Sequence, residues 1–151
     1  MGGDRRKSMF LDSMSRWPAG VTVVTAPEGE DFRPATVSSF TSLSADPPQV
    51  MVAVKSDSRV LSLAQDSGVF FVSILGEEQE HASNACAKSD SMPLGGPFVG
   101  DACATFTCTV EEVLTPTHGT HHILVGRVDT CTPHVGKRPL IYWDRAYQRI
   151  G

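Results

Sequence analysis

Segments with the residue pattern of β-strands follow one another along most of this chain. Val21–Thr25 (VTVVT) consists of β-branched residues, which are stiff at χ1 and fit a pleated surface. Further strand patterns cover residues 34–42, 49–54, 69–75, 104–114, 121–131 and 140–147. Because most of these strands are joined by turns and not by helices, the pattern predicts a mainly β fold with short α-helices. The expected architecture is an antiparallel barrel with helices at its edge, and not a doubly wound sheet.

Helical patterns are few and short. Residues 8–17 predict an amphipathic helix with Ser8 as its N-cap and an apolar face that contains Phe10, Met14 and Trp17. A second helix is expected after Asp57 or Ser58, with its end at Gly68, and a third over residues 77–87. The length of 151 residues suits one domain, 1–151, in which residues 1–8 are expected to be a flexible tail.

Composition excludes several classes of protein. The net charge of −4 argues against a nucleic-acid binder, which needs a basic surface. No stretch approaches the roughly 18 apolar residues of a membrane span, and no secretory signal is visible. The four cysteines form no CxxC pair, so free thiols and a cytoplasmic location are expected.

The run Arg33–Pro48 (RPATVSSFTSLSADPP) is unusually rich in small hydroxyl residues and lies between two apolar strand patterns. These residues are Thr36, Ser38, Ser39, Thr41, Ser42 and Ser44. Small side chains allow a ligand to lie against the backbone, where hydroxyl and N–H groups can bind its polar edge. The alternative is a solvated serine-rich strand and turn, and composition alone does not favour either.

The segment Lys55–Arg59 (KSDSR) brings two cations and two hydroxyls to the junction of a strand and a helix. The N-terminus of a helix favours an anion, because its free N–H groups point outward. A phosphate is therefore one interpretation, and an ordinary capped helix start is the other.

Motifs of other chemistries are absent from the sequence. There is no G-x-G-x-x-G, no P-loop and no G-x-S-x-G. The group His118, His121 and His122 invites a metal site, but neighbouring residues of a strand point to opposite faces, so only one of His121 and His122 can join a given site. A histidine near a cofactor or in solvent is the preferred interpretation, and no metal is expected.

Several blocks of the sequence resemble the flavin reductase family when they are taken together. They are FLDSMSRWPAGVTVVTA, RPATVSSFTSLSADPPQVMVAV, SRVLSLAQDSGVFFVSIL, GTHHILVGRV and PLIYWDRAYQRI, which cover nearly all of Phe10–Ile150. The resemblance is to the short-chain group with an FMN-binding split barrel, an antiparallel and Greek-key-like fold. Its members are reductase components of two-component flavin-dependent monooxygenases.

The resemblance implies roles for particular residues. The flavin ring and ribityl chain would lie along Thr36, Val37, Ser38, Ser39, Phe40, Thr41 and Ser42. The flavin phosphate would lie near Lys55, Ser56, Ser58 and Arg59. The histidine of the family's G-D-H motif falls on His121 and would lie beside the nicotinamide and the flavin. A homodimer with flavin near the subunit interface is also implied.

These features predict an NAD(P)H:flavin oxidoreductase. It would transfer a hydride from NADH or NADPH to FAD or FMN, and the reduced flavin would diffuse to a partner monooxygenase. Thr120 stands where the family usually has Asp, and residues 88–97 form a shorter loop than usual, so the support of His121 and the choice of flavin stay open. The alternatives are a flavin-binding protein without reductase activity and a serine hydrolase that uses Ser38 or Ser39.

Overall fold

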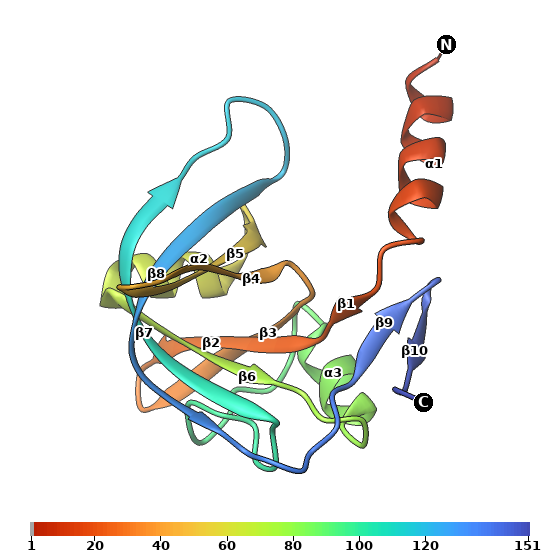
Figure 1. Cartoon of the computed structure of the whole chain (residues 1–151). Helices are drawn as coiled ribbons and strands as arrows, with labels where there is room; N and C mark the ends of the chain where they lie inside the picture. Colours follow the sequence, from red (N-terminus) through yellow and green to blue (C-terminus); the bar gives the residue numbers. More distant parts are fainter. Residues whose placement is uncertain (1) are drawn as a thin grey trace.

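A seven-stranded antiparallel sheet forms the body of the computed structural model, which describes residues 2–151 (Figure 1). Met1, the first residue of the expected tail, lies outside the described residues. The strands of the sheet are β2 (Thr22–Glu28), β3 (Asp31–Val37), β4 (Phe40–Ala45), β5 (Pro48–Lys55), β6 (Val69–Ile74), β7 (Ala104–Leu114) and β8 (His121–Pro133). A small second sheet contains β1 (Ala19–Gly20), β9 (Ile141–Trp143) and β10 (Ala146–Gln148). The helices are α1 (Gly3–Met14), α2 (Arg59–Ser67) and α3 (Glu80–Cys86).

The large sheet curls into a barrel that stays open between its two edge strands. Its strand order is β3-β2-β6-β7-β8-β5-β4, so β3 and β4 are edges although only two residues separate them in the chain. Register shifts in β4 and β7 bend the sheet, as β-bulges do. The expected antiparallel barrel is therefore observed, with α2 and α3 against it (Figure 1).

Strand β2 is buried along most of its length because both of its faces are covered. Val24 and Ala26 belong to the barrel core, whereas Val23 packs in a second cluster with Leu75 and Leu140. The two buried hydroxyls of the strand are satisfied, since Thr22 donates to the Val37 carbonyl at 2.7 Å and Thr25 to the Pro97 carbonyl at 2.6 Å. The β-branched run of the sequence thus forms a strand with two buried faces.

Helix α2 closes one side of the barrel core and matches the sequence prediction. Its side chains Val60, Leu61 and Ala64 are buried in the barrel core. The helix begins after Ser58 and ends at Gly68, whose φ of 77° is the left-handed conformation that glycine adopts most easily.

Two segments differ from their sequence predictions at the ends of the chain. Helix α1 begins at Gly3 and not at Ser8, so it includes most of the expected tail, and none of its residues is buried. Residues 140–147 form a hairpin of β9 and β10 and not one strand. Asp144 and Arg145 form its turn with φ of 52° and 62°, a conformation for which the sequence carries no glycine or asparagine signal.

The expected strand over residues 34–42 is also corrected, because it is two strands with different partners. Residues up to Val37 pair with β2, and residues from Phe40 pair with β5. Ser38 and Ser39 lie between the two strands at the opening of the barrel.

None of the helices in residues 2–151 has the length and apolar character required to cross a bilayer.

Gly126 allows β8 to pack closely against the aromatic core. A Cβ at this position would lie 2.5 and 2.7 Å from two atoms of the buried Phe70 ring and 3.1 Å from the Cβ of Cys108. Gly126→Ala is therefore expected to reduce the free energy of unfolding by about 1–3 kcal/mol, as overpacking does. Urea denaturation measures this change. Gly95→Ala is the control, because no atom lies within 4 Å of its added Cβ, and an equal loss in both variants would contradict the packing argument.

Candidate functional site

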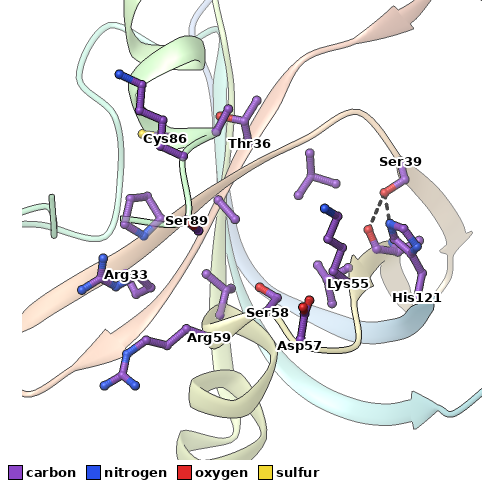
Figure 2. Close-up of a pocket in the computed structure, with 18 of the residues that line it drawn as sticks. Arg33, Thr36, Ser39, Lys55, Asp57, Ser58, Arg59, Cys86, Ser89 and His121 are labelled. Carbon is purple, nitrogen blue, oxygen red and sulfur yellow. Dashed lines mark hydrogen bonds between the residues drawn. The ribbon is translucent and has the colours of Figure 1, made fainter. Parts of the chain in front are cut away.

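A cavity of about 510 Å³ opens beside the gap between β3 and β4 (Figure 2). Its walls come from β3 and the following Ser38–Ser39, the end of β5, the first turn of α2, the residues after α3, and the start of β8. Five segments that are distant in the sequence therefore meet at one site.

Ser39 fixes the wall of the cavity where the chain passes from β3 to β4. Its hydroxyl donates to the Ala53 carbonyl at 2.7 Å and accepts from the Ala53 N–H at 3.1 Å. One side chain thus takes the place of a pair of ladder hydrogen bonds to β5. The Ser39 hydroxyl is consequently engaged in the fold and is not a free nucleophile.

The cavity has two ends that differ in chemistry (Figure 2). Ser39, Lys55 and His121 lie at one end, and Lys55 is the register partner of His121 across β5 and β8. Arg33 and Arg59 lie at the other end, with Ser58 and Asp57 between the two. The site is elongated, so a long ligand can contact both ends.

The first turn of α2 lies between these ends and suits an anion. Ser58 is the N-cap residue with an extended backbone, but it makes no side-chain capping hydrogen bond within the described residues. Its hydroxyl and the first N–H groups of the helix are therefore available to a ligand in the cavity.

The charge of the lining also favours an anionic ligand. Four cationic side chains line the cavity, namely Arg33, Lys55, Arg59 and Lys88, against the single carboxylate of Asp57. This positive lining belongs to a chain whose net charge is −4, so its local charge is opposite to that of the whole chain.

Glu28 holds both arginines of the far end. Arg33 donates to Glu28 Oε1 from Nη2 at 2.6 Å and from Nε at 3.2 Å, while Arg59 Nε pairs with Glu28 Oε2. The hydrogen bonds from Arg33 and Arg59 lower the pKa of Glu28 below its ordinary value of 4.5, so the carboxylate stays charged. Arg33 Nη1 also donates to the Ser91 carbonyl at 2.5 Å, which joins the loop after α3 to β3.

The two neighbouring histidines of β8 have separate partners. His121 lines the cavity, and its Nδ1 lies 2.8 Å from the hydroxyl of Thr120. His122 does not line the cavity, and its Nδ1 lies 2.8 Å from the hydroxyl of Ser56. This arrangement agrees with the alternation of side chains along a strand. Thr120, which stands where the flavin reductase family usually has Asp, thus provides a hydrogen bond to the ring.

Hydroxyl hydrogen bonds hold helix α3 against β3 and against β10. Thr36 donates to the Ser83 carbonyl at 2.6 Å, and the Ser83 hydroxyl lies 2.6 Å from the Tyr147 hydroxyl. These bonds place Cys86 in the cavity wall, where burial raises the pKa of its thiol. Cys86 is therefore a neutral apolar contact.

The structure brings most of the residues named from the sequence to the cavity. Those in the lining are Thr36, Val37, Ser38, Ser39, Lys55, Ser58, Arg59 and His121. Four others lie outside it. Phe40 packs against Phe106 with ring centroids 5.5 Å apart, Thr41 and Ser42 are exposed on the edge strand β4, and Ser56 is bonded to His122.

Sequence reasoning missed the residues that approach from the loop after α3 and from the start of β3. Arg33 is the first residue of the hydroxyl-rich run and lines the cavity. A cation at the start of a proposed ligand-binding segment was the sequence signal that could have identified it. Lys88 and Ser89 line the cavity through tertiary packing, for which the sequence carries no local signal. Within residues 2–151, no three His, Cys, Asp or Glu side chains are grouped to hold a metal ion.

Comparison with known proteins gives a consistent result. The family model described as flavin reductase like domain matches residues 14–151. The reductase component of 4-hydroxyphenylacetate 3-monooxygenase from Thermus thermophilus is 36% identical and is matched over 95% of this chain and 97% of its own length. The structure of the styrene monooxygenase flavin reductase from Pseudomonas putida S12 has a TM-score of 0.84 and 33% identity, with 94% of this chain and 97% of that chain covered.

A third similar protein was solved with nucleotides. It is the NADH:FAD oxidoreductase SgcE6 of Streptomyces globisporus C-1027 in complex with NAD and FAD fragments. Its TM-score is 0.88 at 25% identity, and the match covers 100% of this chain and 96% of that chain. The split-barrel fold implied by the resemblance is therefore confirmed.

The Glu28 cluster generates a prediction about stability. Glu28→Gln is expected to reduce the free energy of unfolding at neutral pH by about 1–2 kcal/mol, because the guanidinium groups of Arg33 and Arg59 lose the negative carboxylate that they share. The pKa of Glu28 is lower in the folded state than its ordinary value of 4.5. The stabilisation that the Glu28 charge provides is therefore complete above pH 4.5, and it is lost as the pH falls through the lower pKa of the folded state.

Denaturant titrations of both proteins between neutral and acidic pH measure this difference. The difference in the free energy of unfolding between wild type and Glu28→Gln should become smaller below pH 4.5. Glu30→Gln is the matched control, because Glu30 is an exposed carboxylate of the same hairpin and forms no ion pair within residues 2–151. A gap that is constant with pH would contradict the role of the Glu28 charge.

Proposed function

Because this chain belongs to the family of flavin reductase-like domains, we propose that it transfers a hydride from NADH to a flavin and supplies reduced flavin to a partner monooxygenase. The observation that carries the proposal is the meeting of His121, the Thr36–Ser39 segment and the first turn of α2 in one elongated cationic cavity. NAD and FAD fragments bind a similar protein, and the anion-binding character of this cavity fits both nucleotides.

The residues present suit a flavin. Ser58 and Lys55 would bind its phosphate, since the N-cap hydroxyl and the first N–H groups of α2 are available there, while the Arg59 side chain extends from this turn toward the end of the cavity with Arg33 (Figure 2). The ring and ribityl chain would lie along Thr36, Val37, Ser38 and Ser39, whose small side chains leave room beside the backbone. Four other residues named from the sequence lie outside the lining, so in this proposal they support the segments that line the cavity and do not contact the flavin themselves. They are Phe40, Thr41, Ser42 and Ser56.

The chain's own groups position the reactants and supply electrostatics. The bound flavin supplies the hydride acceptor, so the protein needs no strong general base. His121 would contact the nicotinamide and the flavin edge, and the Thr120 hydroxyl would hold the imidazole in one orientation. Backbone N–H groups of Ser38 and Ser39 would stabilise the negative charge that develops on the reduced ring.

The proposal extends to the setting of the reaction. Names of relatives pair this activity with monooxygenases, and the reduced flavin would reach such a partner by diffusion. All four cysteines are free, which suits a reducing compartment, so we place the enzyme in the cytoplasm.

A homodimer is part of the proposal because the apolar face of α1 is exposed in this structure, although Asp12 of the helix pairs with Arg145. The helix projects from the barrel and has no buried residue (Figure 1). Phe10 and Met14 are 61% and 49% exposed, and Trp17 just beyond the helix is 70% exposed. An isolated helix of 12 residues is marginal in water, so a second copy that covers this face would stabilise it.

The catalytic proposal is tested by anaerobic stopped-flow reduction of FAD and FMN with NADH. The wild type should bleach the flavin absorbance, and His121→Ala should slow hydride transfer about 10- to 100-fold through loss of positioning, with flavin affinity changed less. His122→Ala is the matched control on the same strand, because His122 lies outside the cavity lining. An unchanged rate in His121→Ala at saturating NADH would refute the role of that residue, and a wild type without reduction would refute the function.

The dimer proposal is tested by light scattering after size-exclusion chromatography. The wild type should have about twice the chain mass of 16.2 kDa. Phe10→Glu should shift the protein toward the monomer, because a charge on the apolar face opposes its burial. Ser8→Glu adds the same charge to the opposite face of α1 and should leave the mass unchanged. A monomeric wild type, or dissociation by both substitutions, would contradict an interface built on this face.

A further inference from the structure

The cavity continues beyond the place proposed for the flavin's own phosphate, and its far end is basic. Arg33 and Arg59 lie at this end, away from His121 and Ser39 (Figure 2). We infer that this end binds the second phosphate of a flavin dinucleotide, so that the protein takes FAD in preference to FMN. The inference rests on the proposed function, because it assumes that the ring lies at the His121 end.

The two arginines retain hydrogen-bond donors for a ligand. A guanidinium group has five N–H donors. Arg33 uses Nε, Nη1 and Nη2 once each, toward Glu28 and the Ser91 carbonyl, which leaves two N–H groups. Arg59 uses only Nε, toward Glu28, so both of its terminal nitrogens remain available within the described residues. These planar groups match the geometry of phosphate oxygens.

Glu28 organises this end without neutralising it. One carboxylate lies between two guanidinium groups, so the cluster keeps a net positive charge. The Arg33 side chain is only 17% exposed, and its bonds hold the guanidinium in place before a ligand arrives. Such preorganisation reduces the entropy that is lost on binding. Lys88 and Ser89 extend the polar lining on the side of the loop after α3.

The order of groups along the cavity favours the flavin that carries two phosphates. Riboflavin has no phosphate, and FMN has one, which the first turn of α2 would bind. FAD alone carries a second phosphate with an adenosine beyond it. From the His121 end the lining passes Ser58 and then reaches Arg33 and Arg59, so the second phosphate is the group that this end would meet (Figure 2).

Isothermal titration of FAD, FMN and riboflavin tests this inference on the wild type and on Arg33→Gln. The wild type should bind FAD at least about tenfold more tightly than FMN, a factor that corresponds to about 1.4 kcal/mol. Arg33→Gln should raise the Kd of FAD about tenfold and that of FMN by a clearly smaller factor. Arg33→Lys, which keeps the charge but not the fork of donors, should have an intermediate effect.

Arg127→Gln is the matched control, because it removes the same charge from a half-exposed arginine outside the cavity lining. It should leave the ratio of the two affinities unchanged. A wild type with equal affinity for FAD and FMN would overturn the inference whether or not any variant folds. An equal loss for both flavins in Arg33→Gln would also overturn it.

A further measurement shows whether the basic end binds FAD or NADH. If Arg33→Gln raises the KM for NADH and leaves the Kd of FAD unchanged, the basic end serves the pyrophosphate of NADH and the inference is wrong. If the wild type prefers FAD but does not reduce it with NADH, the proposed function fails while the assignment of the second phosphate stands. Binding and turnover are therefore read separately.

Discussion

The passage of the chain from β3 to β4 through only two residues is the constraint on which the site depends. β3 pairs with β2 and β4 pairs with β5, at opposite ends of the strand order. Because Ser38 and Ser39 span so short a distance, the two edges must lie close together, and the sheet must curl into a barrel. The Ser39 hydroxyl satisfies the Ala53 N–H and carbonyl at this point. The cavity opens where the ladder is interrupted, so the candidate site lies at the irregular part of the barrel.

Core packing positions the charged groups around this opening. Val60, Leu61 and Ala64 anchor α2 in the barrel core, which places Ser58 and Arg59 at the cavity. β3 holds Arg33, and the Glu28 carboxylate joins that strand to α2 through both arginines. The bond from Thr36 to the Ser83 carbonyl adds α3 to the same arrangement. The groups that line the cavity are therefore carried by elements that also contribute side chains to the packed core, which favours a rigid site.

The sequence predicted the elements that have strong local signals. Most of the strands and the Ser58 and Gly68 ends of α2 rest on residue patterns of a few positions, whereas the choice of His121 over His122 came from the resemblance to the flavin reductase family. It did not predict the break after Val37, because the hydroxyl-rich pattern continues across it and only the pairing with β2 and β5 decides where each strand ends. The turn at Asp144–Arg145 lacks the glycine that most often supplies positive φ. Lys88 and Ser89 reach the cavity by packing between distant segments, which a local pattern cannot reveal.

Thr120 illustrates how the same hydrogen bond can be kept with a different charge. A carboxylate next to His121 would hold the imidazole in place, but it would also add a negative charge to a cavity suited to anionic nucleotides. The threonine hydroxyl lies 2.8 Å from His121 Nδ1 and can donate or accept, so it orients the ring without adding charge. Lys55 is the register partner of His121, and under the proposed function its attraction for a ligand phosphate or a reduced ring would not be weakened by a neighbouring carboxylate. Under the proposed function, orientation of the histidine and attraction of the nucleotides would thus fall to separate residues in this chain.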